Sequence, residues 1–82
     1  MSRSKRYYIE KVGVGFYSDE GPAKRPIFLD KLLPYSPSFN NENQGYKKVD
    51  EWEQSGYTQV GDVYRVFSAE VVDDSIPPEI QP

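Results

Sequence analysis

Twelve aromatic side chains, seven of them tyrosine, lie in a chain of 82 residues that contains no cysteine and no histidine. A domain of this size without disulfides or a zinc site depends on a small apolar core for its stability. Aromatic and β-branched residues supply most of the large apolar side chains here, and these residue types favour strands. The composition therefore predicts a single small domain that is mainly β.

The absence of histidine and cysteine also limits the chemistry of the chain. Imidazole and thiol are the side chains most easily adjusted for catalysis near neutral pH, and they are the usual ligands of zinc. Adjacent acids occur at residues 19–20, 50–51 and 73–74, but their spacing matches no calcium loop. We therefore expect a protein that is not an enzyme, with no catalytic residues, no metal and no cofactor.

The first strand is predicted over residues 6–17, where Val12, Val14 and Phe16 share one face at a period of two. Gly13 lies between them and allows a bend. Residues 27–33 fit either a short strand or a helical turn, and the following proline ends both.

A short helix is predicted over residues 49–55, with Val49 and Trp52 facing inward and Gly56 ending it. Two further strands, 57–60 and 63–72, flank Gly61-Asp62, a pair that favours a two-residue hairpin turn. The predicted core consists of Val12, Val14, Phe16, Leu29, Trp52, Val63 and Phe67.

These elements predict a small curled antiparallel sheet or partial barrel, SH3-like or OB-like, with one or two short helices. Residues 1–72 are expected to form the domain, with a basic N-terminal arm. Residues 73–82 are acidic and rich in proline, which predicts an extended tail. No apolar run approaches the roughly 20 residues of a membrane span, and no signal segment follows Met1. We expect a cytoplasmic or virion-associated protein with no membrane contact.

Charge is distributed unevenly along the chain. Residues 1–48 carry nine Lys or Arg and five Asp or Glu, a net charge of +4, whereas residues 49–82 carry only Arg65 and eight acids, a net charge of −7. The two halves either neutralise each other in the fold or attract partners of opposite charge. We favour mutual neutralisation.

Basic residues lie beside aromatic ones in the first half, a combination found in proteins that bind single-stranded nucleic acid on a small barrel. The net acidity of the chain, and the fact that strand aromatics usually pack in cores, weigh against this reading. The residues of this candidate nucleic-acid site are Arg3, Lys5, Arg6, Tyr7, Tyr8, Lys24, Arg25, Lys47 and Lys48.

A protein-binding module is the preferred hypothesis. Residues 34–45 form a long loop without periodicity, and such loops in small domains are often used for contact. Rigid aromatics and extended arms also suit protein interfaces. We expect an accessory protein of a phage or virus, either an assembly component or an inhibitor of a host protein, with single-stranded nucleic-acid binding as the alternative. The predicted partner-binding residues are Tyr35, Phe39, Tyr46, Asp73 and Asp74.

Overall fold

The computed structural model describes residues 4–80, and all the strands in this range join one antiparallel sheet in the order β3-β2-β1-β4-β5. The prediction of a mainly β fold is confirmed. The sheet does not close into a barrel, because β3 and β5 are its two edges. The elements are β1 (Ser4–Lys11), β2 (Gly15–Glu20), a 3-10 turn (Pro22–Lys24), β3 (Pro26–Leu29), α1 (Glu42–Gln54), β4 (Tyr64–Val71) and β5 (Glu79–Ile80).

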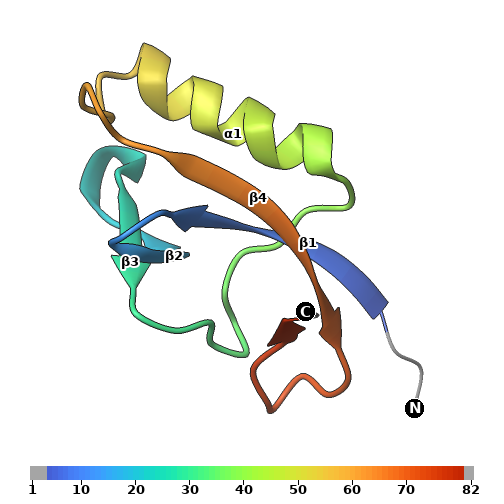
Figure 1. Cartoon of the computed structure of the whole chain (residues 1–82). Coiled ribbons are helices and arrows are strands. Elements are labelled where there is room, and N and C mark those ends of the chain that lie inside the picture. The colour runs from blue at the N-terminus through green and yellow to red at the C-terminus, as the bar shows by residue number, and fades with distance from the viewer. Residues whose placement is uncertain (1–3, 81–82) are drawn as a thin grey trace.

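The sheet is covered differently on its two faces. Figure 1 shows α1 lying across one face, above β4 and β1, while the segment between β3 and α1 and the last residues pass beneath the other. We call these the helix face and the loop face. The molecule therefore has three layers, which are α1, the sheet and an irregular layer of loop segments beneath it.

Alternation along the central strands builds a separate apolar cluster on each face, since successive strand residues point to opposite sides. On the helix face, Ile9, Tyr17, Val66 and Trp52 of α1 form the buried centre of the larger cluster. The smaller cluster on the loop face consists of Tyr8, Leu32 and Ala69, with Phe16, Phe67 and Val71 packed against it.

The predicted strand 6–17 is in fact a hairpin. Gly13 has a φ of +83°, and the amide of Val14 donates to the Lys11 carbonyl, so the chain turns between β1 and β2. Val12 and Val14 consequently lie in an exposed turn, with 50% and 57% of their surfaces accessible. Their assignment to the core was wrong because the β-branched residues of the turn continue the alternation of the strand.

Helix α1 begins seven residues before the predicted start. The Asn41 side chain accepts a hydrogen bond from the Gln44 amide, and the Gln44 side chain accepts one from the Asn40 amide. This reciprocal arrangement resembles a capping box and satisfies amides that the helix start leaves free. Trp52 faces the sheet as predicted, and the helix ends at Gln54, two residues before Gly56.

The chain between α1 and β4 contains no strand, so the predicted strand 57–60 and its hairpin at Gly61-Asp62 were wrong. The Asp62 side chain instead accepts a bond from the Gln59 amide and closes a local turn. Val63 and Leu29 were also wrongly assigned to the core, because they are 59% and 40% exposed.

Two segments complete the sheet from outside its long strands. Phe39, in the chain before α1, exchanges two backbone hydrogen bonds with Tyr7, on the same side of β1 as β2 but beyond the residues that β2 pairs with. Near the C-terminus, Ile80 pairs with Ala69 and Pro78 is buried. Part of the predicted tail is thus an edge strand of the sheet.

Candidate interaction surface

A row of four side chains crosses the loop face from β3 to β4. Leu29 is the register partner of Phe16, Phe16 of Glu10, and Glu10 of Arg65. Directly opposed residues of antiparallel strands project to the same face, so the four side chains form one line across the sheet. Leu29 and Arg65 are exposed, while Glu10 and Phe16 are half-buried.

Phe67 lies two residues after Arg65 in β4 and projects to the same face as the row. Its ring lies 5.6 Å from that of Phe16 in an edge-to-face arrangement, and the Arg65 guanidinium lies 4.9 Å from the Phe67 centroid. Arg65 Nη2 is also 2.8 Å from Glu10 Oε1, which neutralises its charge. We call these five residues the uncovered strip. It combines two aromatic rings, one exposed leucine and a neutralised arginine, a composition typical of protein interfaces.

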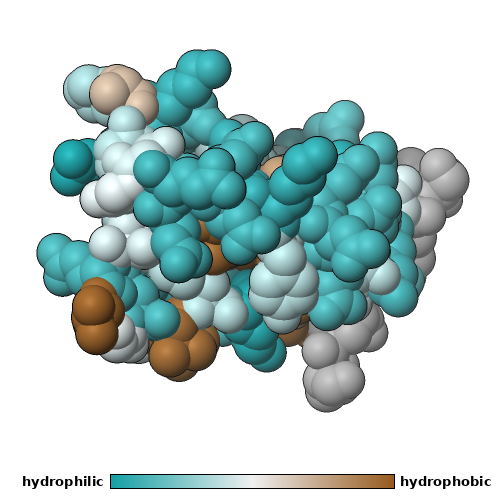
Figure 2. All heavy atoms as spheres, turned by 90° about the horizontal axis from the view of Figure 1, so that it is seen from above, coloured by the Kyte–Doolittle hydropathy of each residue, from teal (hydrophilic) through white to brown (hydrophobic). Residues whose placement is uncertain are grey.

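Exposed valines extend the apolar surface beyond the end of the strip. Val12 and Val63 are held side by side, because the Val12 amide donates to the Val63 carbonyl, and Val14 is exposed in the same turn as Val12. Viewed from the α1 side in Figure 2, the molecule is mostly hydrophilic, and the strongest hydrophobic colour lies along one edge. The surface seen from the α1 side is thus mainly polar.

The N-terminal part of the candidate nucleic-acid site is largely occupied by the fold. Arg6 donates to Ser38 Oγ at 3.0 Å and to Asn40 Oδ1, which fastens the segment before α1 to β1. Tyr8 is 2% exposed, and burial raises the pKa of its phenol. Tyr7 is half-buried and packs against the core of the helix face. Tyr8 therefore presents no open ring face on which a base could stack.

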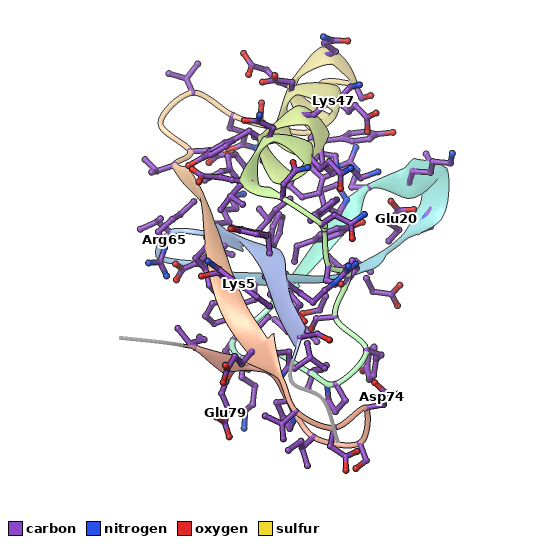
Figure 3. All side chains as sticks on the ribbon, turned by 90° about the vertical axis from the view of Figure 1, so that its right-hand side faces the viewer. Lys5, Glu20, Lys47, Arg65, Asp74 and Glu79 are labelled. Carbon is purple, nitrogen blue, oxygen red and sulfur yellow. The ribbon has the colours of Figure 1, made fainter. Side chains whose placement is uncertain are left out.

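The remaining basic residues of that candidate site are dispersed. Lys48 is 3.1 Å from Glu20 and 3.5 Å from Glu51, and Arg25 lies over the ring of Tyr57. Figure 3 shows Lys5 on β1 well away from Lys47 on α1. Lys24 is exposed in the turn before β3, and Arg3 lies outside the described residues.

The predicted partner-binding residues do not form one patch either. Tyr35 and Tyr46 are 70% and 41% exposed, the first in the segment beneath the sheet and the second on α1. Phe39 packs against the core, and Asp73 accepts bonds from the Ser75 amide and hydroxyl. Asp74 is exposed and lines a shallow pocket of about 270 Å³ together with Arg6 and Tyr8.

A pocket of about 530 Å³ lies between the C-terminal half of α1 and the turn before β3. Trp52 forms part of its wall, and the indole Nε1 has no hydrogen-bond partner among the described residues. The rings of Tyr17 and Phe28 stand at steep angles to the indole, at centroid distances of 4.8 and 5.7 Å. The pocket is lined by Ala23, Lys24, Lys48, Glu51, Trp52, Gln54, Ser55 and Tyr57.

Two tyrosine–carboxylate pairs border the helix face. Tyr17 donates to Glu20 at 2.9 Å, and burial with this carboxylate raises the pKa of Tyr17 well above its ordinary value. Hydrogen bonds from Tyr17 and Lys48 hold the pKa of Glu20 below its usual range. Burial, together with the nearby Asp62, likewise raises the pKa of Tyr64 to about 12. Both phenols therefore stay protonated at neutral pH and act as hydrogen-bond donors within the fold.

Within residues 4–80, no three acidic side chains gather into a group that would hold a metal ion. None of the helices in this range is long and apolar enough to cross a membrane. No family model matches the sequence, and comparisons with curated proteins and with solved structures found no significant similarity. Inferences about function therefore depend on the surface itself.

The sequence did not identify the residues of the uncovered strip as a contact surface. Phe16 and Phe67 were assigned to the core and Leu29 with them, while Glu10 was not considered. The sequence did indicate part of the strip, because Glu10 follows Tyr8 by two residues and so projects to the same face of a strand. Predicting the row, however, requires the register of four strands, and part of that register is set by the hairpin turn between β1 and β2, which was not predicted.

Proposed function

We propose that this chain is a protein-binding module without enzymatic activity, and that the uncovered strip is its contact surface. The observation that carries the proposal is the row Leu29–Phe16–Glu10–Arg65, which leaves apolar and aromatic groups partly accessible on the loop face. A strip with rings at its centre and a neutralised arginine beside them matches the anchors that protein partners bury.

Binding of single-stranded nucleic acid receives less support. It requires aligned cations and accessible rings, whereas Arg6, Lys48 and Arg65 are engaged by oxygen groups of the fold and Tyr8 is buried. Lys11 pairs with Asp62 and Lys48 with Glu51, and each of these pairs joins a cation of the basic half to an acid of the acidic half. This supports mutual neutralisation of the halves over attraction of an anionic polymer. The setting of a phage or viral accessory protein stays a prediction.

The test is affinity capture from the source cells with the chain as bait, with and without nuclease. We expect a protein retained equally in both arms and lost with Leu29→Asp, which places a charge in the strip. Val60→Asp is the matched control, because Val60 is fully exposed in the chain before β4 and takes no part in the strip. Circular dichroism of both variants confirms that they are folded.

The captured protein is then purified and its affinity for the chain measured by calorimetry. We expect Leu29→Asp to weaken binding at least about tenfold, the effect of losing a central contact, and Val60→Asp to leave it unchanged. Capture that disappears on nuclease treatment, or a Leu29→Asp variant that binds as well as the parent, would refute the proposal.

A further inference from the structure

The outer edge of β4 is only partly paired. β5 covers Ala69 and Glu70, and the four residues Tyr64–Phe67 have no strand neighbour on that side within the described part of the chain. Figures 1 and 3 agree that this stretch of β4 borders the outside of the sheet, with α1 above it and β5 at its lower end. An unpaired edge of this kind is a template for another strand.

The hydrogen bonds of β1 show which backbone groups face this edge. Tyr7 lies opposite Ser68 in β4 but exchanges both of its backbone bonds with Phe39 on its other side. The Tyr7–Ser68 pair is therefore a non-bonded pair of the ladder, and such pairs alternate with bonded ones. It follows that Tyr64 and Val66 turn their backbone N–H and C=O groups away from β1, toward the open edge.

A small pocket adjoins the same edge on the helix face. It has a volume of about 150 Å³ and lies between α1 and the chain leading into β4, with Tyr64 in its wall. Glu53 is an exposed acid at its rim, and Val49 supplies an apolar wall. Asp62, in the opposite wall, pairs with Lys11 at 3.5 Å. Alternate side chains of an added strand point to this face, so the pocket is placed to receive one of them.

The charge of the surrounding elements indicates what kind of strand fits. Besides the acids that pair with Lys11 and Lys48, exposed acids remain around this border, namely Asp50 and Glu53 on α1 and Glu79 on β5. Arg65, the one cation of residues 49–82, is neutralised by Glu10 at 2.8 Å. A basic segment is complementary to this border, whereas an acidic segment or a nucleic acid is repelled by it.

We propose that Tyr64–Phe67 of β4 pairs with an extended, lysine- or arginine-bearing segment of a partner protein, which adds to the sheet as a sixth strand. One basic side chain of that segment enters the pocket beside Glu53. The inference rests on the proposed function, since it specifies how part of a protein partner is held.

The test uses the full chain and an acetylated, amidated heptapeptide of alternating lysine and valine. Isotope-edited NMR is expected to show the largest amide shifts at Tyr64 and Val66, together with slower amide exchange at both. The same peptide with N-methyl groups on every second residue, made in both phases, keeps its side chains but loses the backbone donors of one edge. At least one phase is expected to abolish binding, because pairing uses those donors.

Charge is tested with Glu53→Lys, which reverses one side of the pocket. Asp50→Lys makes the same change on an exposed neighbouring position of α1 that does not line the pocket. We expect Glu53→Lys to weaken peptide binding about three- to tenfold and Asp50→Lys to weaken it less, because exposed charge pairs contribute modestly and locally.

Four outcomes overturn the inference: no binding of the peptide, binding insensitive to N-methylation in either phase, shifts centred away from β4, and equal effects of the two lysine substitutions. Dimerisation of the chain through this edge, seen by analytical ultracentrifugation, also overturns it. None of these outcomes affects the proposed function, which depends on the captured protein and on Leu29→Asp. Conversely, peptide binding at β4 does not rescue the proposed function if Leu29→Asp has no effect.

Discussion

Ala23 and Lys24 adopt left-handed backbone conformations, with φ angles of 59° and 60°, in the turn between β2 and β3. This conformation costs an L-residue about 1–2 kcal/mol, and glycine avoids that cost. Glycine also gives the unfolded chain more conformational freedom, which offsets part of the gain in stability. We therefore predict that Ala23→Gly raises the free energy of unfolding by about 0.5–1 kcal/mol, measured by urea denaturation. The Ala23 carbonyl still accepts the hydrogen bond from Tyr57, because that contact uses the backbone.

Ala69→Gly is the matched control for this prediction. Ala69 is 1% exposed within β4, where glycine loses a buried methyl group and gains backbone freedom in the unfolded state. A loss of about 1 kcal/mol is expected there. If both substitutions destabilise the chain equally, the turn at Ala23 stores no strain.

The buried phenols give the stability of the fold an alkaline limit. Burial raises the pKa of Tyr64 to about 12 and that of Tyr17 further, from an ordinary value of 10. The folded state therefore retains protons that the unfolded state releases. Stability from these groups is complete below pH 10 and is lost as pH rises from about 10 toward 12, by up to about 1.4 kcal/mol per pH unit for each tyrosine.

Urea denaturation at several pH values between 9 and 12 checks this prediction. The double substitution Tyr17→Phe with Tyr64→Phe removes the two phenols, so it should flatten the loss of stability above pH 10. Tyr35→Phe, which alters a 70% exposed ring, should leave the pH dependence as in the parent. An unchanged slope in the double variant would contradict the assignment.

At the scale of elements, α1 packs closely against β4 at Gly45, a residue without a side chain. A Cβ added at Gly45 would lie 2.7 Å from Val66 Cγ1 and 2.9 Å from Cγ2, and the branched valine has little freedom to move away. Gly45→Ala, which normally strengthens a helix, should here cost about 1–3 kcal/mol. The measurement is a double-mutant cycle in urea, in which Val66→Ala should recover part of the loss. Additive effects would show that the two residues do not touch.

The elements also show how far local sequence signals reach. β4 was predicted almost to the residue, because a run of valine and aromatics there has no internal turn signal. The start of α1 was missed although Asn41 and Gln44 carry a recognisable cap, since the surrounding asparagines also favour loops. Gly61-Asp62 has the composition of a hairpin turn, yet tertiary context placed no strand before it.

Over the whole molecule, the candidate surface was less predictable than the fold. The basic and aromatic residues of the first half were recognised as a group, but Tyr8 is used as core and Arg6 as a fastener of the neighbouring segment. Sequence shows which residues are able to bind. It does not show which of them the fold has already engaged, because that depends on pairing between distant segments.

The two apolar clusters lie on opposite faces, yet we predict that the molecule unfolds as one unit. Neighbouring residues of the same strands supply both clusters, Ile9 beside Tyr8 in β1 and Val66 close to Ala69 in β4, so neither cluster persists without the other. Trp52 fluorescence reports the helix face, and methyl NMR of Leu32 reports the loop face. Their urea midpoints should coincide, as expected for a two-state domain.

Leu32→Ala provides the decisive comparison, because Leu32 is 5% exposed on the loop face and belongs to no cluster on the helix face. Truncating a buried leucine costs about 2–5 kcal/mol, a large share of the stability of so small a domain. The substitution should therefore lower the midpoint seen by Trp52 fluorescence as much as the midpoint from far-ultraviolet circular dichroism. If the Trp52 transition keeps its parental midpoint while part of the β signal is lost, the two faces fold independently, and the sheet does not couple them.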